Sequence, residues 1–91
     1  MTKQTILIVD DDPKIRELLA LYFNKESFSI VEASDGLDAI RQTEKLQPQL
    51  ILLDIMLPVL DGIEVCRQIR KFSQVPIIMT AVSRHRQFCS H

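Results

Sequence analysis

Residues 6–13 read Ile-Leu-Ile-Val-Asp-Asp-Asp-Pro, so four apolar side chains are followed at once by three carboxylates and a proline. A continuous apolar run of this kind is typical of a strand that is covered on both faces of a parallel sheet. Aspartate is a preferred N-cap residue, and proline is favoured at the first position of a helix. The stretch therefore predicts a buried strand, an acidic loop and the start of a helix.

Three further apolar runs follow, at residues 28–31, 50–53 and 75–79. Helices are expected between them, over residues 13–24, 35–46 and 62–71. The first of these helices carries Ile15, Leu18, Leu19, Tyr22 and Phe23 at helical spacing. Such an alternation of strands and helices indicates βαβ units and a parallel sheet. The run at 28–31 is more mixed in polarity than the others, which favours a position at the edge of the sheet.

The composition limits the classes of protein to consider. The chain has 91 residues, 46% of them hydrophobic, and a net charge of -1 from 11 basic and 12 acidic residues. We expect one small domain with no charge-driven attraction to nucleic acid or to an anionic membrane. No apolar run is long enough to serve as a signal peptide core or a membrane span, so we expect a cytoplasmic protein whose Cys66 and Cys89 are reduced thiols.

The acidic residues lie where a parallel sheet binds its ligands. Asp10 and Asp11 follow the first apolar run, and Asp54 ends the third. Ligands of open parallel sheets bind outside the carboxyl ends of the strands, and neighbouring carboxylates there repel one another unless a cation neutralises them. Mg²⁺ is bound by one or two carboxylates together with water and phosphate oxygens. Asp54 is thus a candidate third ligand or a candidate nucleophile that accepts a phosphoryl group.

Simpler explanations exist for each of these residues. A solvated acidic loop would account for Asp10 and Asp11, and helix capping alone accounts for Asp12. Thr80 follows the fourth apolar run, where its hydroxyl could donate to a phosphoryl oxygen. A β-branched residue at the end of a strand needs no such role, however. The residues alone leave these alternatives open.

The segments ILIVDDD, LLDIMLPVLDGIEVCRQIR and VPIIMTA closely resemble the receiver domain of bacterial two-component response regulators. The resemblance runs from about residue 5 to residue 81 and is closest to the subfamily with winged-helix DNA-binding output domains. It implies a flavodoxin-like α/β fold with strand order 2-1-3-4 and helices on both faces. It also implies a phosphoacceptor signalling domain that assists its own phosphotransfer and dephosphorylation, rather than a classical enzyme.

The resemblance assigns a role to each candidate residue. Asp54 would accept a phosphoryl group from a sensor histidine kinase in a Mg²⁺-dependent reaction. Asp10 and Asp11 would hold the Mg²⁺, joined by Asp54 and the backbone carbonyl of Met56. Thr80 would be the switch hydroxyl that turns toward the phosphoryl group. Any DNA binding would belong to a longer parent protein, a transcriptional regulator, and not to this segment.

The fourth apolar run departs from the family pattern. Receivers of this type usually read Pro-Ile-Ile-Met-Leu-Thr-Ala, whereas residues 76–81 read Pro-Ile-Ile-Met-Thr-Ala, which is one apolar residue shorter. Because side chains alternate between the two faces of a strand, this deletion turns Thr80 away from the site unless a bulge absorbs it.

The sequence also has no match for the fourth helix, fifth strand and fifth helix of the family, or for the lysine and the aromatic residue of that strand. We expect residues 1–81 to form an incomplete, C-terminally truncated receiver domain, and residues 82–91 to be a tail outside the family without fixed structure. The run that begins at Val75 and ends at Met79 would then form an open edge through which the chain self-associates.

Two other functions are compatible with the residues. The first is a truncated receiver that binds metal or its kinase without productive phosphotransfer, which the absent lysine favours. The second is an aspartyl-phosphate hydrolase of the haloacid dehalogenase type, which has a similar fold. Those hydrolases place a second aspartate two residues after the nucleophile, and Met56 stands at that place here.

Overall fold

The computed structural model describes residues 4–81. Its strands are β1 (Thr5–Val9), β2 (Ser29–Ala33), β3 (Leu50–Asp54) and β4 (Ile77–Thr80), and its helices are α1 (Pro13–Lys25), α2 (Gly36–Leu46) and α3 (Gly62–Ile69). All the strand pairs are parallel and the sheet has the order β2-β1-β3-β4. The predicted α/β fold and strand order are confirmed, with β2 at one edge. The expectation for residues 82–91 concerns residues outside the described part of the chain.

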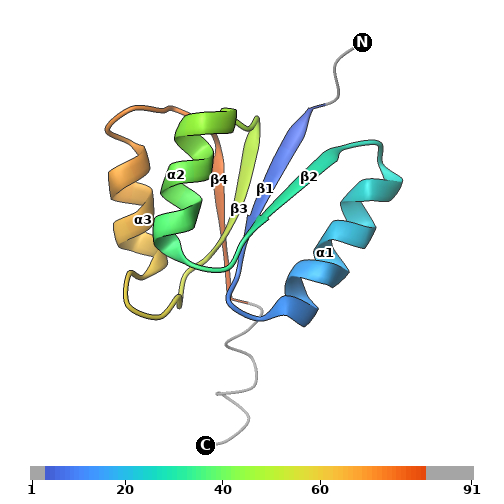
Figure 1. Ribbon diagram of the computed structural model, residues 1–91, viewed down its shortest axis with the longest axis horizontal. Helices are drawn as coiled ribbons and strands as arrows, with labels where there is room; N and C mark the ends of the chain where they lie inside the picture. The colour runs from blue at the N-terminus through green and yellow to red at the C-terminus, as the bar shows by residue number, and fades with distance from the viewer. Residues whose placement is uncertain (1–3, 82–91) are drawn as a thin grey trace, which may run out of the picture.

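Helices cover both faces of the sheet. Figure 1 shows α2 and α3 side by side on one face and α1 alone on the other. The core under α2 and α3 contains Leu7, Val9, Ile51 and Leu53 from the sheet and Ala39, Val65 and Ile69 from the helices. The core under α1 contains Ile6, Ile8 and Leu52, packed against Leu19 and Phe23. Strands β1 and β3 are thus buried on both faces, as their continuous apolar runs predicted.

Helix α1 contacts the sheet through only some of the apolar residues that the sequence places at helical spacing. Leu19 and Phe23 pack against the sheet, while Leu18 and Tyr22 are 63% and 62% exposed. The helix begins as expected, because the Asp12 side chain accepts a hydrogen bond from the Lys14 amide and Pro13 occupies the first turn. Within residues 4–81, no helix combines the length and apolar character that a membrane span requires.

Strand β4 begins two residues later than the apolar run suggested. Val75 is buried before the strand starts, and the carbonyl of Pro76 accepts a hydrogen bond from the Ile51 amide at 3.0 Å. From there the ladder runs without interruption from Ile77 opposite Ile51 to Thr80 opposite Asp54. The β3–β4 ladder therefore contains no bulge that would absorb the residue missing from the family pattern.

Candidate functional site

Three carboxylates meet at the carboxyl end of the sheet. Val9 is paired with Leu53, so Asp10 and Asp54 occupy equivalent positions at the ends of neighbouring strands. One carboxylate oxygen from each of Asp10, Asp11 and Asp54 lies within 4.8 Å of the others. Asp10 and Asp54 are buried and Asp11 is exposed. The parallel register brings together residues that are more than forty positions apart in the sequence.

The surroundings of Asp10 raise the pKa of its carboxyl group. Its Oδ1 accepts a hydrogen bond from the Asp12 amide at 2.9 Å, but its buried Oδ2 has no hydrogen-bond partner among the described residues. Burial is the main cause that raises the pKa of Asp10 to about 6; the hydrogen bond from the Asp12 amide opposes it, and the charges of Asp54, Asp11 and Asp12 add to it. An unpaired buried carboxylate oxygen is rare in a folded protein, so Asp10 Oδ2 is a candidate ligand atom for a cation.

The residues fit a hard divalent cation. A cation placed among the three carboxylates would give Asp10 Oδ2 its missing partner and offset the mutual repulsion of the charges. Carboxylate oxygens with access to water are the ligands that Mg²⁺ prefers, and the exposed Asp11 gives the cluster that access. Asp10, Asp11 and Asp54 are the residues that would hold it.

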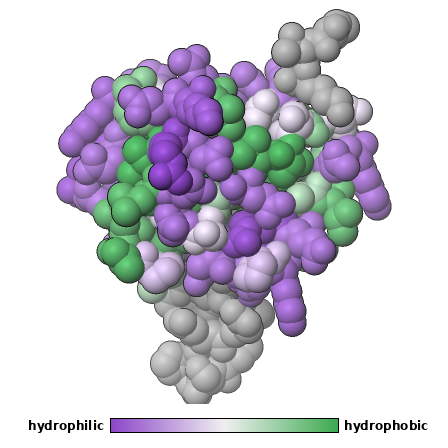
Figure 2. All heavy atoms as spheres, viewed as in Figure 1, coloured by the Kyte–Doolittle hydropathy of each residue, from purple (hydrophilic) through white to green (hydrophobic). Residues whose placement is uncertain are grey.

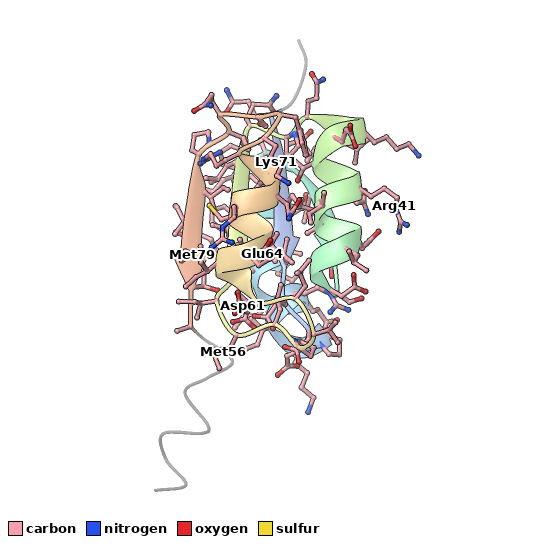
Figure 3. All side chains as sticks on the ribbon, turned by 90° about the vertical axis from the view of Figure 1, so that its left-hand side faces the viewer. Arg41, Met56, Asp61, Glu64, Lys71 and Met79 are labelled. Carbon is pink, nitrogen blue, oxygen red and sulfur yellow. The ribbon has the colours of Figure 1, made fainter. Side chains whose placement is uncertain are left out.

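The loop between β3 and α3 follows Asp54 directly and contacts its carboxylate. The Met56 amide donates to Asp54 Oδ1 at 3.0 Å, so the backbone of Met56 lies against this carboxylate. Figure 3 shows Met56 and Asp61 at the same end of the molecule, where Asp61 caps α3. Gly62 closes the loop, because its amide donates to the Ile55 carbonyl and a Cβ there would lie 2.5 Å from the Asp54 carbonyl oxygen. The role of the Met56 carbonyl as a metal ligand stays a prediction.

Thr80 lies directly beside Asp54. The two residues are partners in the β3–β4 ladder, and residues in register on neighbouring parallel strands present their side chains on the same face. The carbonyl of Thr80 accepts a hydrogen bond from the Ile55 amide at 2.9 Å, which closes the ladder just past Asp54. The shortened fourth run therefore does not turn Thr80 away from Asp54.

Sequence reasoning missed a cation next to the cluster. The Arg16 guanidinium donates from Nη1 to the Asp10 carbonyl at 2.7 Å and from Nε to Glu32 Oε1 at 3.1 Å. A basic residue one helical turn after the capping Asp12 was the signal that could have indicated it, because long helical side chains point back toward the helix N-terminus.

The β3–α3 loop also presents apolar side chains to solvent. Met56 is exposed and Val59 is fully exposed with a φ of 66°, and Ile63 is exposed in the first turn of α3, just after the loop. Figure 2 shows apolar atoms at the surface over this loop, on a face that is otherwise mostly hydrophilic. This apolar surface lies at the same end of the sheet as the three carboxylates.

The fold and the site together define a flavodoxin-like α/β domain with a carboxylate cluster at the carboxyl ends of β1 and β3. Comparison with known proteins agrees: the family model of the response regulator receiver domain matches residues 6–90. The chain belongs to this family of receiver domains.

Curated relatives include DNA-binding response regulators. The chain is 46% identical over 77 residues to the DNA-binding response regulator MtrA of Mycolicibacterium smegmatis, covering 85% of this chain and 34% of the relative. It is 51% identical over 74 residues to the transcriptional regulatory protein ResD of Bacillus subtilis, covering 81% of this chain and 31% of the relative. The chain thus spans about a third of the length of these relatives.

Solved structures show the same fold. The BeF3-activated N-terminal receiver domain of RstA from Klebsiella pneumoniae has a TM-score of 0.79 and 33% identity, covering 96% of this chain and 78% of that one. A chemotaxis protein of Vibrio cholerae has a TM-score of 0.81 at 23% identity, covering 98% of this chain and 80% of that one, and it shows the fold alone.

Proposed function

We propose that the chain accepts a phosphoryl group on Asp54 in a Mg²⁺-dependent reaction and thereby takes part in two-component signalling. The observation that carries this proposal is the convergence of Asp10, Asp11 and Asp54 at the carboxyl end of the sheet of a receiver domain. Asp54 is the acceptor in this proposal because it is the last residue of β3 and lies beside Thr80.

The proposed reaction is a single phosphoryl transfer. A carboxylate oxygen of Asp54 forms a bond to phosphorus, while the bond between phosphorus and the imidazole nitrogen of a phosphohistidine breaks and its electron pair stays on that nitrogen. Bound Mg²⁺ would supply positive charge against the phosphoryl oxygens. Asp10 and Asp11 hold that charge in place, and the Thr80 hydroxyl donates a hydrogen bond to the transferred group.

The donor in this proposal is a sensor histidine kinase, and the compartment is the cytoplasm. Support comes from the family and from relatives that are named DNA-binding or transcriptional regulators. We infer that the longer protein of this type regulates transcription and that the segment described here contacts the kinase rather than DNA.

The direct test is the intact mass of the 91-residue chain after incubation with acetyl phosphate and Mg²⁺. We expect the protein to gain the mass of one phosphoryl group, to gain nothing when Mg²⁺ is removed with a chelator, and to gain nothing as Asp54→Asn. Uptake by Asp54→Asn would place the acceptor elsewhere and contradict the proposal.

The same samples test the alternative of a receiver that binds metal without productive transfer. In that case thermal melts would shift with Mg²⁺ in the wild-type chain, while no phosphoryl adduct would form.

A further inference from the structure

We propose that Arg16 is a positioning residue for the metal site: it holds the Asp10 peptide so that the Asp10 carboxylate faces the other two carboxylates. This inference rests on the proposed function and adds to it a residue outside the acidic cluster. It is carried by the two hydrogen bonds of the Arg16 guanidinium, one to the Asp10 carbonyl and one to Glu32.

Asp10 sits where three elements meet, and each of its polar groups but one is held. Its amide donates to the Ala33 carbonyl at the end of β2, at 3.2 Å. Its Oδ1 accepts from the Asp12 amide, and its carbonyl accepts from Arg16. The remaining oxygen, Oδ2, is the one without a partner among the described residues. These hydrogen bonds determine the orientation of the carboxylate and leave Oδ2 available to a cation.

Arg16 is itself held in place by its surroundings. Its side chain is only 17% exposed and is paired with Glu32, which is 43% exposed. The guanidinium is planar and rigid, so donation to Glu32 from Nε determines the direction in which Nη1 points. A lysine ammonium at this position is a single point charge and cannot hold both acceptors in the same fixed geometry. The Glu32 carboxylate therefore orients Arg16, and Arg16 orients Asp10.

Arg16 donates its hydrogen bond to the backbone carbonyl of Asp10 and not to the carboxylate. Its effect on the site is therefore to position Asp10 rather than to neutralise the charge of its side chain. Burial is the largest cause of the raised pKa of Asp10. Removing the guanidinium would leave the Asp10 carbonyl, just after β1, without this donor and let the loop that carries Asp10 and Asp11 move. Partners that orient metal ligands in this way commonly change metal affinity tenfold or more when they are lost.

The test compares Arg16→Met and Arg16→Lys with Leu19→Ala in the 91-residue chain. Leu19 packs α1 against the sheet but belongs to the core rather than to the site, so its truncation loosens α1 without removing a contact of Asp10. The Mg²⁺ dissociation constant is measured by calorimetry at a temperature where each variant is folded. We expect about a tenfold weaker affinity for Arg16→Met, an intermediate loss for Arg16→Lys, and wild-type affinity for Leu19→Ala.

A second readout is independent of Mg²⁺. The Asp12 amide, which donates to Asp10 Oδ1, should exchange its hydrogen faster in Arg16→Met than in Leu19→Ala when both are compared at equal global stability. Equal Mg²⁺ affinity of Arg16→Met and wild type, or equal loss in Leu19→Ala, would overturn the positioning role. Failure of the wild-type chain to bind Mg²⁺ would instead contradict the metal site of the proposed function, whose phosphoacceptor is tested separately by Asp54→Asn.

The role of Glu32 gives a further arm of the same experiment. Glu32→Ala should weaken Mg²⁺ binding less than Arg16→Met does, and it should add nothing when both substitutions are combined, because Glu32 acts through Arg16. Additive effects of the two substitutions would show that Glu32 acts on the site by another route and would overturn the proposed chain of contacts.

Discussion

Asp54 and Thr80 are direct partners at the ends of β3 and β4, and the Thr80 carbonyl accepts the hydrogen bond of the residue that follows Asp54. This pairing places a hydroxyl on the same face as the proposed phosphoacceptor. It holds although the fourth apolar run is one residue shorter than the family pattern.

The first prediction concerns the Thr80 hydroxyl. A hydrogen bond to a charged group contributes about 1.5–3 kcal/mol, so its loss from the transition state should slow phosphorylation about tenfold or more. We expect this loss for Thr80→Val and near wild-type rates for Thr80→Ser, measured by mass spectrometry with acetyl phosphate and Mg²⁺. Equal rates for the valine and serine variants would show that the hydroxyl has no part in the transfer.

The second prediction concerns pH. The pKa of Asp10 is raised from 3.8 to about 6, so in this range the folded state binds more protons than the unfolded state, and the apo protein loses stability as the pH rises from about 4 to 6. Asp10→Asn removes this effect. Its gain in the free energy of unfolding should be small near pH 4 and reach roughly 2–3 kcal/mol above pH 6.

Asp11→Asn is the matched control, since it also removes one of the three charges but from an exposed side chain. We expect it to stabilise the apo protein much less than Asp10→Asn in urea titrations across the same pH range. A gain for Asp10→Asn that does not vary with pH would contradict the assignment of the raised pKa.

The third prediction concerns the close approach of Gly62 to β3. A Cβ at this position would lie 2.5 Å from the Asp54 carbonyl oxygen and 2.8 Å from the Ile55 Cα, and backbone atoms cannot move aside as a flexible side chain can. Gly62→Ala should therefore lower the free energy of unfolding by about 1–3 kcal/mol, although alanine is the better helix former. Urea unfolding checks this, and a variant as stable as wild type would show that the loop relaxes freely.

The fourth prediction concerns Val59, a β-branched residue with a φ of 66° and a fully exposed side chain. The left-handed region costs an L-residue about 1–2 kcal/mol, whereas glycine adopts it without that cost. Val59→Gly should raise the free energy of unfolding by about 0.5–1 kcal/mol, since the greater flexibility of glycine in the unfolded chain cancels part of the gain.

Val59→Ala serves as the control for this substitution. It removes the β-branch but retains the Cβ that conflicts with the left-handed conformation, so it should recover only part of the gain. A glycine variant that is less stable than wild type in urea titration would mean that the side chain makes a stabilising contact.

The fifth prediction concerns the run that begins at Val75 and ends at Met79. Within residues 4–81, β4 pairs with β3 alone, and Ile78 and Met79 are 52% and 38% exposed. Apolar strand edges promote pairing with other chains, so we expect the 91-residue chain to self-associate as its concentration rises. Ile78→Lys should reduce association in sedimentation experiments.

Leu37→Lys provides the comparison for that experiment, because Leu37 is also an exposed apolar residue but lies on α2, away from β4. It should leave the association unchanged. A wild-type chain that stays monomeric at every concentration, or an equal effect of both lysine substitutions, would contradict association through β4.

The sequence by itself determined the layout of the protein. Continuous apolar runs at β1 and β3 predicted strands buried on both faces, and the carboxylates that follow them predicted an acidic site at one end of a parallel sheet. Asp12 caps α1 at the predicted place, and Asp35 and Asp61 cap α2 and α3, which begin within one residue of the predicted starts. These features depend on local pattern and short-range hydrogen bonds, which neighbouring residues in the chain are sufficient to specify.

Only the tertiary structure decided which of the adjacent carboxylates is buried, that Thr80 lies opposite Asp54, and that Arg16 reaches the carbonyl of Asp10. The first two depend on how the strands assemble, and the third depends on how α1 packs against β1 and on the contact of Arg16 with Glu32 of β2. Asp10 and Asp11 are chemically identical neighbours, yet the side chains of successive residues leave the backbone in different directions, so one enters the interior and the other faces water. Burial then gives Asp10 its raised pKa, and this environment is a property of the assembled sheet rather than of the residue.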